Sequence, residues 1–474
     1  MSLPTVAVIG GGISGLAAAH RLRELQNQSQ KFNIVLLEAG PRLGGIVESE
    51  RVNGFLLEKG PDAFLREKPW AWELAARLGL DDQLIGTRQE ARQTFIVRQN
   101  RLIPVPEGFY LISPVKIGPF LRSELFSVPG KLRILAEPFV PPRRDEEQES
   151  LADFVRRRFG RECLERAGQP MLAGIYTGDP EKLGIISTLG RFHELEKRHG
   201  SVLLGLRREK KDASLDKASG PRYGLFVSFK NGMQTLTDAL EKTLPADAAR
   251  LNTAARGIRY DGSGKMWHIL TSGETVQAQA VVCALPARAA SAVFRQNLTE
   301  LSAELSQLNY ESVATLHLAY EKKQLTRLPK GFGFVTPKTE KKAVIACTFV
   351  DQKFEGRAPR DFCLFRAFVG GAFGREYLAE SDAGILATAE KELGQLFGIR
   401  TEAVFKRLQR HPDSMVQYSP GHRSWLGRVN RLAGAFPGLF LTGASYAGVG
   451  LPDCVRDAEM QAQEAGLFLN PIRL

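Results

Sequence analysis

The stretch Val6-Ala7-Val8-Ile9-Gly10-Gly11-Gly12-Ile13-Ser14-Gly15 decides the fold of this 474-residue chain. Its first four residues are apolar and mostly β-branched, which predicts a buried strand that runs directly into a glycine-rich turn. The glycines follow the G-x-G-x-x-G spacing. Gly10 permits the tight turn, Gly12 lets the backbone approach a pyrophosphate, and Gly15 lets the next helix pack on the strand. The alternative is a glycine-rich turn that holds no ligand.

A second predicted strand, Ile34–Leu37, ends in Glu38. A carboxylate about twenty residues after the glycines can accept hydrogen bonds from ribose hydroxyls, and it repels a 2′-phosphate. The helix that follows Gly15 presents its N-terminal amides and the positive end of its dipole to the pyrophosphate. These features predict a Rossmann-like α/β domain that binds FAD or NAD rather than NADP.

Later segments favour a flavin over NAD. Arg42-Leu43-Gly44-Gly45 and Leu57-Glu58-Lys59-Gly60-Pro61-Asp62 continue the site in the manner of flavoproteins with two dinucleotide-binding domains. Near the C-terminus, Gly448-Val449-Gly450-Leu451-Pro452 leads into a helical pattern from Asp453 to about Phe468. Amides at that helix start can bond the pyrimidine edge of an isoalloxazine, and the helix dipole stabilises a reduced, anionic flavin. An ordinary strand–turn–helix that closes the domain is the alternative interpretation.

Composition excludes several classes of protein. The net charge of +12 and the pI near 9.5 invite a nucleic-acid interpretation, but acids are interspersed and no recognition motif is present. An anionic substrate, an anionic membrane surface or a plain solvated surface fits the charge better. The five cysteines are scattered without C-x-x-C, and the seven histidines show no metal-ligand spacing. We therefore expect no disulfide framework, no metal site, no signal peptide and no transmembrane helix, and hence a cytoplasmic protein that is at most peripheral on the membrane.

The chain is long enough for two or three domains, and its pattern changes several times. Strand-rich patterns are predicted at 313–320, 331–336, 343–350 and 362–369, an all-apolar strand starts at Val281, and residues 209–222 have the composition of a mobile surface loop. The cofactor domain is predicted to comprise three segments, 1–87, 223–290 and 406–474. A helical insertion is predicted at 88–208, and a substrate-binding sheet domain at 291–405.

From Val6 to about Gln463 the chain resembles the oxygen-dependent protoporphyrinogen and coproporphyrinogen III oxidases of haem biosynthesis. The segments that carry this resemblance lie in order along the chain. They are Glu58–Leu65, Met171–Asp179, His199–Gly205, Gly331–Phe334, Gln417-Tyr418-x-x-Gly421-His422 and Gly443–Cys454. The resemblance implies a two-dinucleotide-binding-domain flavoprotein, p-hydroxybenzoate-hydroxylase- or monoamine-oxidase-like, with a mixed-sheet substrate domain and a helical insertion.

Three details resemble the coproporphyrinogen-type enzymes of Gram-positive bacteria. Pro452-Asp453-Cys454 stands where protoporphyrinogen-type members usually have Asn-Asp-Cys, and Ala346–Phe349 occurs together with Arg357-Ala358-Pro359. Thr94 stands where protoporphyrinogen-type enzymes have an arginine that pairs with a substrate propionate. The chain departs from the pattern before Gln417, where Val416 replaces a usual proline, and Arg410-His411 lies where a tryptophan is often found upstream. Altered packing beside the flavin is expected there.

The family removes six electrons from a porphyrinogen in three turns of non-covalent FAD, which molecular oxygen reoxidises with release of hydrogen peroxide. Because the flavin does the chemistry, no catalytic side chain is predicted. The resemblance implies a slot for the macrocycle lined by Gly174, Phe332, Gly333, Val335 and Phe368, although plain sheet core is an equal alternative for the two phenylalanines. Arg92, Arg98 and Arg101 are candidate propionate partners. The predicted cofactor-binding residues are Gly10, Gly11, Gly12, Ile13, Ser14, Gly15, Glu38, Arg42, Gly44, Gly45, Gly60, Pro61, Asp62, Ala255, Val449, Gly450 and Leu451.

Three questions stay open at this point. Residues 109–122 combine apolar side chains with a basic edge, which fits a membrane-surface patch, a substrate-channel lip or a buried helical core. A flavin amine oxidase, a carotenoid desaturase or a non-catalytic flavin-binding or haem-chaperoning protein is an alternative function. The partners expected are the porphyrinogen and oxygen, without nucleic acid, together with a homodimer or a handover to the next enzyme of the haem pathway.

Overall fold

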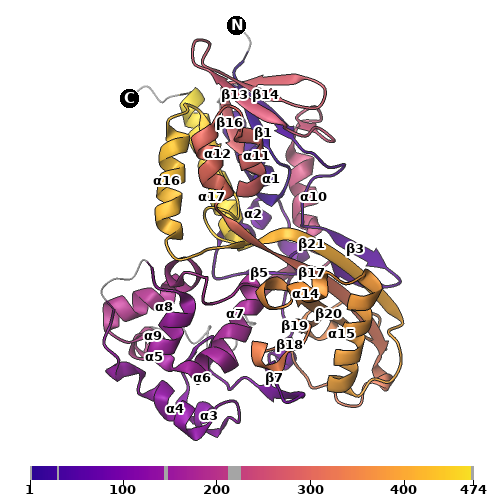
Figure 1. Ribbon diagram of the computed structural model, residues 1–474. Helices are drawn as coiled ribbons and strands as arrows, with labels where there is room; N and C mark the ends of the chain where they lie inside the picture. The colour runs from indigo at the N-terminus through magenta and orange to yellow at the C-terminus, as the bar shows by residue number, and fades with distance from the viewer. Residues whose placement is uncertain (1–2, 29–30, 144–147, 212–225, 471–474) are drawn as a thin grey trace.

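A parallel sheet built from both ends of the chain organises the upper half of the molecule (Figure 1). The computed structural model describes residues 3–28, 31–143, 148–211 and 226–470, so most of the predicted loop at 209–222 lies outside the described residues. The strand order is β12-β2-β1-β16-β22, and each neighbouring pair is parallel. The strands are β1 (Thr5–Ile9), β2 (Asn33–Leu37), β12 (Ala249–Arg250), β16 (Ala280–Cys283) and β22 (Leu439–Leu441). The predicted Rossmann-like α/β fold is confirmed.

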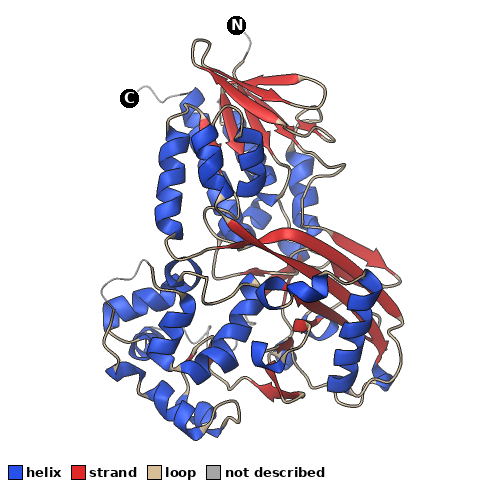
Figure 2. Cartoon of the chain, in the orientation of Figure 1, coloured by secondary structure: helices blue, strands red, loops and turns tan. Residues whose placement is uncertain are grey.

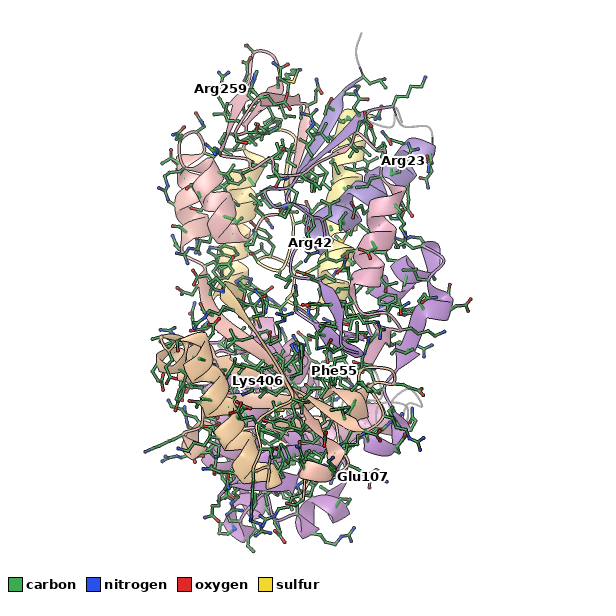
Figure 3. The ribbon with its side chains drawn as sticks, turned by 90° about the vertical axis from the view of Figure 1, so that its right-hand side faces the viewer. Arg23, Arg42, Phe55, Glu107, Arg259 and Lys406 are labelled. Carbon is green, nitrogen blue, oxygen red and sulfur yellow. The ribbon has the colours of Figure 1, made fainter. Side chains whose placement is uncertain are left out.

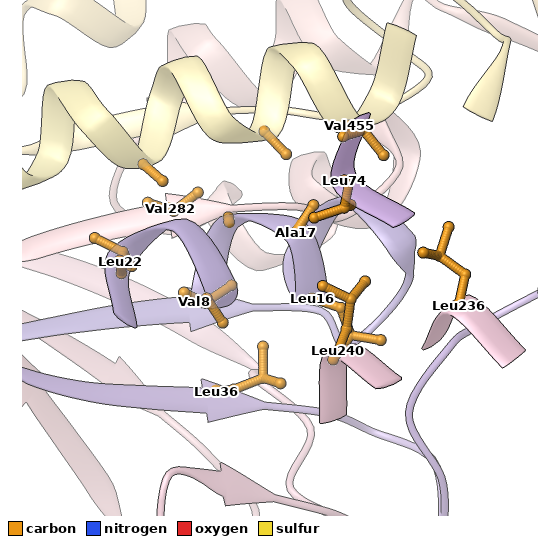
Figure 4. Packing of buried hydrophobic residues seen from close by; sticks show 14 of the residues in the cluster. Val8, Leu16, Ala17, Leu22, Leu36, Leu74, Leu236, Leu240, Val282 and Val455 are labelled. Atoms are coloured by element: carbon orange, nitrogen blue, oxygen red, sulfur yellow. The ribbon is translucent and has the colours of Figure 1, made fainter. Parts of the chain in front are cut away.

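Two helices far apart in sequence, α1 (Ile13–Asn27) and α17 (Leu451–Leu469), pack together over one face of this sheet. Small side chains such as Ala17 and Ala458 are fully buried in the core that the helices share, so the two helices approach closely. Figure 4 shows Ala17 and Val455 in this core, with Val455 beside Leu74. The same core takes in α2 (Trp70–Arg77) and α10 (Gln234–Thr243). The opposite face is covered by α11 (Ala287–Phe294), α12 (Thr299–Ser306) and α16 (His422–Gly434), with the meander β13 (Gly257–Asp261), β14 (Met266–Leu270) and β15 (Thr275–Ala278).

A second, mixed sheet lies in the lower half, in the order β21-β17-β20-β19-β18-β7-β8 (Figure 2). The helix α15 (Asp382–Phe397) covers one of its faces. Its strands are β7 (Thr94–Arg98), β8 (Arg101–Pro104), β17 (Asn309–Glu321), β18 (Gly333–Val335), β19 (Val344–Phe349), β20 (Phe362–Gly370) and β21 (Phe405–Gln417). The four strand-rich patterns predicted between 313 and 369 are confirmed. The sheet also draws strands from the segments assigned to the helical insertion and to the last cofactor segment, and the division at 88 and 406 stays a prediction.

The helical layer below holds α3 (Ile117–Arg122), α4 (Val128–Leu135), α5 (Leu151–Phe159), α6 (Arg161–Cys163), α7 (Gln169–Tyr176), α8 (Ile185–His199) and α9 (Val202–Lys211). Shorter elements connect the layers: β3 (Ser49–Val52), β4 (Phe55–Glu58), β5 (Phe64–Leu65), β6 (Leu84–Gly86), β9 (Phe109–Tyr110), β10 (Ser113–Pro114), β11 (Phe226–Phe229), α13 (Val350–Lys353) and α14 (Arg375–Leu378). Of the described helices, none has the length and apolar character needed to cross a bilayer.

The stretch 109–122 is partly core. Phe109, Leu111, Ile112 and Phe120 are each at most 3% exposed, so the buried-core interpretation holds for them. The exposed apolar side chains near it are Leu121 at the end of α3, Val128 and Leu132 on α4, and Phe139 on the short turn after α4.

We expect Gly333→Ala to destabilise the fold by about 3 kcal/mol, because overpacking and a strained backbone act together. The φ of Gly333 is +146°, and an added Cβ would lie 2.0 Å from the carbonyl oxygen of Cys347 on the neighbouring strand. The measurement is the free energy of unfolding in urea. Gly427→Ala, in an exposed turn of α16 where an added Cβ meets no atom within 4 Å, is the matched control and is expected to be neutral or slightly stabilising. Equal stability of the two variants would contradict the packing argument.

Candidate functional site

The turn after β1 opens a space in front of the N-terminus of α1. An alanine Cβ at Gly15 would lie 1.8 Å from the carbonyl oxygen of Gly10, so only glycine lets α1 start against the strand. At Gly12, by contrast, an added Cβ would meet no atom within 4 Å. No side chain caps this helix, so its first amides have no side-chain acceptor at the N-cap. A phosphate-bearing ligand fits both observations.

Glu38 fixes the rim of that space. Its carboxylate accepts hydrogen bonds from the backbone N–H of Gly11 and of Gly40, both at 2.7 Å. Each carboxylate oxygen has a second acceptor site, so the group can still accept from a ribose hydroxyl. This bracing of the turn was not predicted from the sequence.

The loop after β2 closes against the first turn. Gly44 forms a parallel bridge with Gly12 and donates its N–H to Gly11 at 2.8 Å. Arg42, labelled in Figure 3, donates to the carbonyls of Leu43 (2.7 Å) and Gly45 (2.5 Å) and pairs with Glu48 at 3.0 Å. The guanidinium therefore shapes its own loop, where the sequence had suggested a cofactor contact alone.

The segment before Ala255 belongs to the same rim. Thr253 donates its N–H to the Glu38 carbonyl at 2.8 Å, and Asn252 donates to Gly40 at 2.9 Å. Ala255, which is half-buried, lies two residues after Thr253.

The C-terminal motif meets the N-terminal one. A Cβ at Gly443 would lie 3.7 Å from the Ser14 hydroxyl oxygen, and Asp457 accepts from Thr442 Oγ1 at 2.7 Å, which ties the loop to α17. No side chain caps α17. Its first turn lies beside that of α1, because the Cys454 thiol and the Ser14 hydroxyl are hydrogen-bonded. The half-buried Val449 packs against the hydrophobic cores of both the upper domain and the helical layer.

Gly60-Pro61-Asp62 joins the two sheets. A Cβ at Gly60 would lie 1.9 Å from the Ile46 carbonyl oxygen. The Asp62 carboxylate accepts from Lys353 Nζ at 2.7 Å, and Arg366 of β20 donates to the Gly60 carbonyl. Burial opposes ionisation of Asp62, but the positive charges of Lys353 and Arg366 outweigh it and hold the pKa of this carboxyl below its usual range.

One face of the second sheet supplies an apolar wall. Ile96, Val335, Ala346 and Phe368 are successive cross-strand partners and so lie on one face. Gly174 of α7 is exposed opposite, where an added Cβ would lie 3.4 Å from Val335 Cγ1. We call this junction, where Gly174 of α7 meets the apolar wall, the slot.

The other two predicted slot residues serve the sheet. Position 333 must be glycine because an added Cβ would collide with the Cys347 carbonyl on β19, as described above. Phe332 is 2% exposed and is adjacent in sequence to Gly333, so the two residues point to opposite faces of the sheet. Sheet core is therefore the favoured interpretation for Phe332.

The three candidate arginines differ in position. Arg92 is half-buried and its Nε is buried without a partner among the described residues. Arg98 donates to the Glu124 carbonyl at 2.8 Å, and Arg101 is exposed on the edge strand β8. Arg92 is the one nearest in sequence to the slot-facing Thr94.

This geometry is that of a Rossmann-like α/β fold in which the glycine turn after β1 and the start of the C-terminal helix lie together, beside a second sheet with an apolar wall. The sequence matches the flavin-containing amine oxidoreductases over residues 13–465, and the chain belongs to that family. The protein is therefore a flavin-dependent oxidoreductase.

Individual relatives cover nearly the whole chain. It is 33% identical over 468 residues to coproporphyrinogen III oxidase of Bacillus subtilis, with 98% of each chain covered. It is 28% identical to the chloroplastic protoporphyrinogen oxidase 1 of Arabidopsis thaliana, covering 98% of this chain and 88% of that protein. A solved structure from Exiguobacterium sp. 255-15, of a protein assigned provisionally as a protoporphyrinogen oxidase, superposes with a TM-score of 0.85 at 29% identity, covering 98% and 99% of the two chains.

The two glycines of the first turn should respond differently to alanine. Gly12→Ala places its Cβ in the open space and is expected to keep the stability of the parent while losing at least tenfold in flavin affinity. Gly15→Ala drives its Cβ into the Gly10 carbonyl and is expected to lower the melting temperature as well. Flavin titration of the apoprotein and thermal unfolding without flavin separate the two effects. Unchanged flavin affinity in Gly12→Ala would rule out a ligand at this turn.

Proposed function

We propose that this chain oxidises a porphyrinogen to the porphyrin with non-covalently bound FAD, in three two-electron turns, with molecular oxygen as acceptor and hydrogen peroxide as product. The observation that supports this most is the near-complete, collinear similarity to a coproporphyrinogen III oxidase. The apolar slot beside the cofactor region suits a large macrocycle with aliphatic and aromatic contacts.

The chain's own residues fit a flavin. The bound flavin accepts the hydride from the substrate. The open space at Gly12 and the uncapped starts of α1 and α17 are the features that receive the phosphates and the pyrimidine edge in this proposal. The apolar wall excludes water from the reacting carbon and holds the macrocycle in place.

The geometry around Cys454 supports non-covalent binding. Its thiol is buried and donates to the Gly448 carbonyl at 3.6 Å. Burial raises the pKa of the Cys454 thiol to about 12, so the sulfur is protonated at neutral pH and is a poor nucleophile.

Coproporphyrinogen III is the proposed substrate. It carries four carboxylates, which the net charge of +12 attracts. In addition, Thr94 stands at the position where protoporphyrinogen-type members have an arginine that pairs with a substrate propionate. Arg92 is the proposed carboxylate partner, because its buried Nε has no partner in the described residues of the chain.

We expect kcat/KM for coproporphyrinogen III to exceed that for protoporphyrinogen IX at least tenfold, with three molecules of hydrogen peroxide per porphyrin. Initial rates are read from porphyrin fluorescence under air, with peroxide measured in parallel. A simple amine such as putrescine serves as the control for the amine-oxidase alternative. Preference for protoporphyrinogen IX would overturn the substrate assignment, and turnover of the amine alone would overturn the proposed function.

We also propose peripheral contact with anionic membranes through an apolar patch on the helical layer, which lies at the bottom of the molecule in Figure 1. Leu121, Val128, Leu132 and Phe139 are 48%, 69%, 63% and 88% exposed. Lys131 lies among them and donates to the Leu121 carbonyl at 2.7 Å, and Arg122 adds a second positive charge. Exposed apolar side chains next to basic ones favour a lipid interface.

Co-sedimentation with vesicles that contain phosphatidylglycerol tests this contact. The doubly substituted Leu132→Asp/Phe139→Asp chain is expected to bind such vesicles at least fivefold more weakly than the parent, because each change adds a negative charge to the patch. Val404→Asp, at a residue 52% exposed on the sheet domain, is the control and should bind as the parent does. A parent chain that stays in the supernatant would refute the contact.

A further inference from the structure

A polar row runs beside the apolar wall of the slot. Thr94, Gly333, Thr348, Arg366 and His317 are successive cross-strand partners from β7 to β17. They therefore lie on the same face of the sheet as the wall, one pleat away. Buried polar atoms without a partner among the described residues include Thr94 Oγ1, Arg366 Nε and His317 Nε2. Three such atoms in one row point to a ligand, because buried polar groups are normally hydrogen-bonded.

Arg366 is the charged member of this row. It is 5% exposed, its guanidinium lies 4.8 Å from the centre of the Phe368 ring, and it donates to the Gly60 carbonyl. It thus touches both the slot wall and the proposed cofactor segment. Within the described residues of the chain, no carboxylate lies within salt-bridge distance of it.

The buried charges around Arg366 do not balance. Lys353 pairs with Asp62 at 2.7 Å, and Arg357 faces Glu58 at 3.9 Å. A further carboxylate of this sheet domain, Asp351, has a 10% exposed side chain and faces Lys322 at 3.8 Å. Arg366 is left as one excess positive charge at the joint between the two sheets.

The histidines near Arg366 do not change this balance. Burial and the nearby guanidinium lower the pKa of His317 to about 3, and the same two causes lower the pKa of His411. Both rings are therefore neutral at physiological pH, and neither competes with Arg366 as the local cation.

A buried cation without a counter-ion is unfavourable until an anion comes close. An oxidised flavin is neutral, whereas a reduced flavin is an anion at neutral pH. We propose that Arg366 is a positioning residue whose charge is held for the reduced flavin, so that it raises the reduction potential of the bound cofactor. The inference rests on the proposed function only for flavin binding, not for the identity of the substrate.

Two substitutions separate the charge of Arg366 from its hydrogen bond. Arg366→Lys keeps the charge, and Arg366→Gln keeps a donor for the Gly60 carbonyl without the charge. Arg407→Met is the matched control, because Arg407 is the next member of the same row but is exposed and paired with Glu50 at 2.8 Å.

The readouts are the midpoint potential of the bound flavin and the dissociation constant of its sulfite adduct, neither of which needs a porphyrinogen. We expect Arg366→Gln to shift the two-electron reduction equilibrium at least tenfold toward the oxidised form, about 30 mV, and to weaken the sulfite adduct by a similar factor. Arg366→Lys should stay within threefold of the parent, and Arg407→Met should be unchanged.

Other outcomes would overturn the inference. An unchanged potential in Arg366→Gln together with a raised KM for coproporphyrinogen would make Arg366 a carboxylate anchor for the substrate. If Arg366→Gln does not fold, Arg366→Lys becomes the test. A tenfold shift of its two-electron reduction equilibrium toward the oxidised form, about 30 mV, would contradict the inference, because this variant retains the charge. A parent chain that binds no flavin would refute the proposed function instead.

Discussion

Close packing of α1 against α17 is the constraint on which the rest of the structure depends. Alanines on both helices bring them together over the parallel sheet, so that residues about 440 positions apart form one rim. The uncapped N-termini of the two helices then face the same region. Two helix dipoles and two sets of free amides converge there, which suits a ligand with phosphates at one end and an electron-accepting ring at the other. In the proposed function the slot can act only if the substrate in it lies next to a cofactor held at that rim.

Much of this arrangement could be predicted from the sequence because the controlling signals are local. Val6–Gly15 specifies strand, turn and helix through residues in direct succession. The motif predicts that Gly15 lets the helix pack on the strand, and in the structure an added Cβ at Gly15 would collide with the Gly10 carbonyl. The strands between 313 and 369 follow from apolar alternation within each segment, and family resemblance supplied the order of the segments. Gly174 and Val335 were placed together by resemblance, and in the structure they are neighbours, while their contact with a substrate stays a prediction.

What could not be predicted depends on pairing between distant segments. Strand periodicity does not say that β7 joins β18, nor that Thr348 faces Arg366, since register is fixed by the whole sheet. Glu38 was expected to bind ribose, but its bracing of the glycine turn needs the three-dimensional path of that loop. Arg366 could have been noticed in the sequence as a single cation inside an apolar strand, because charged side chains are rarely buried unless they are paired. The structure shows in addition that Arg366 has no carboxylate partner among the described residues.

The use of both chain ends in one sheet has a consequence for biosynthesis. β1 is synthesised before β22 and α17, so the parallel sheet cannot close until those two elements have been made. Until then the face of α1 that packs on α17 is uncovered, and the long sequence separation of these contacts favours slow folding and exposure to aggregation. Closure of the parallel sheet, and with it the formation of the rim, therefore waits for the synthesis of β22 and α17.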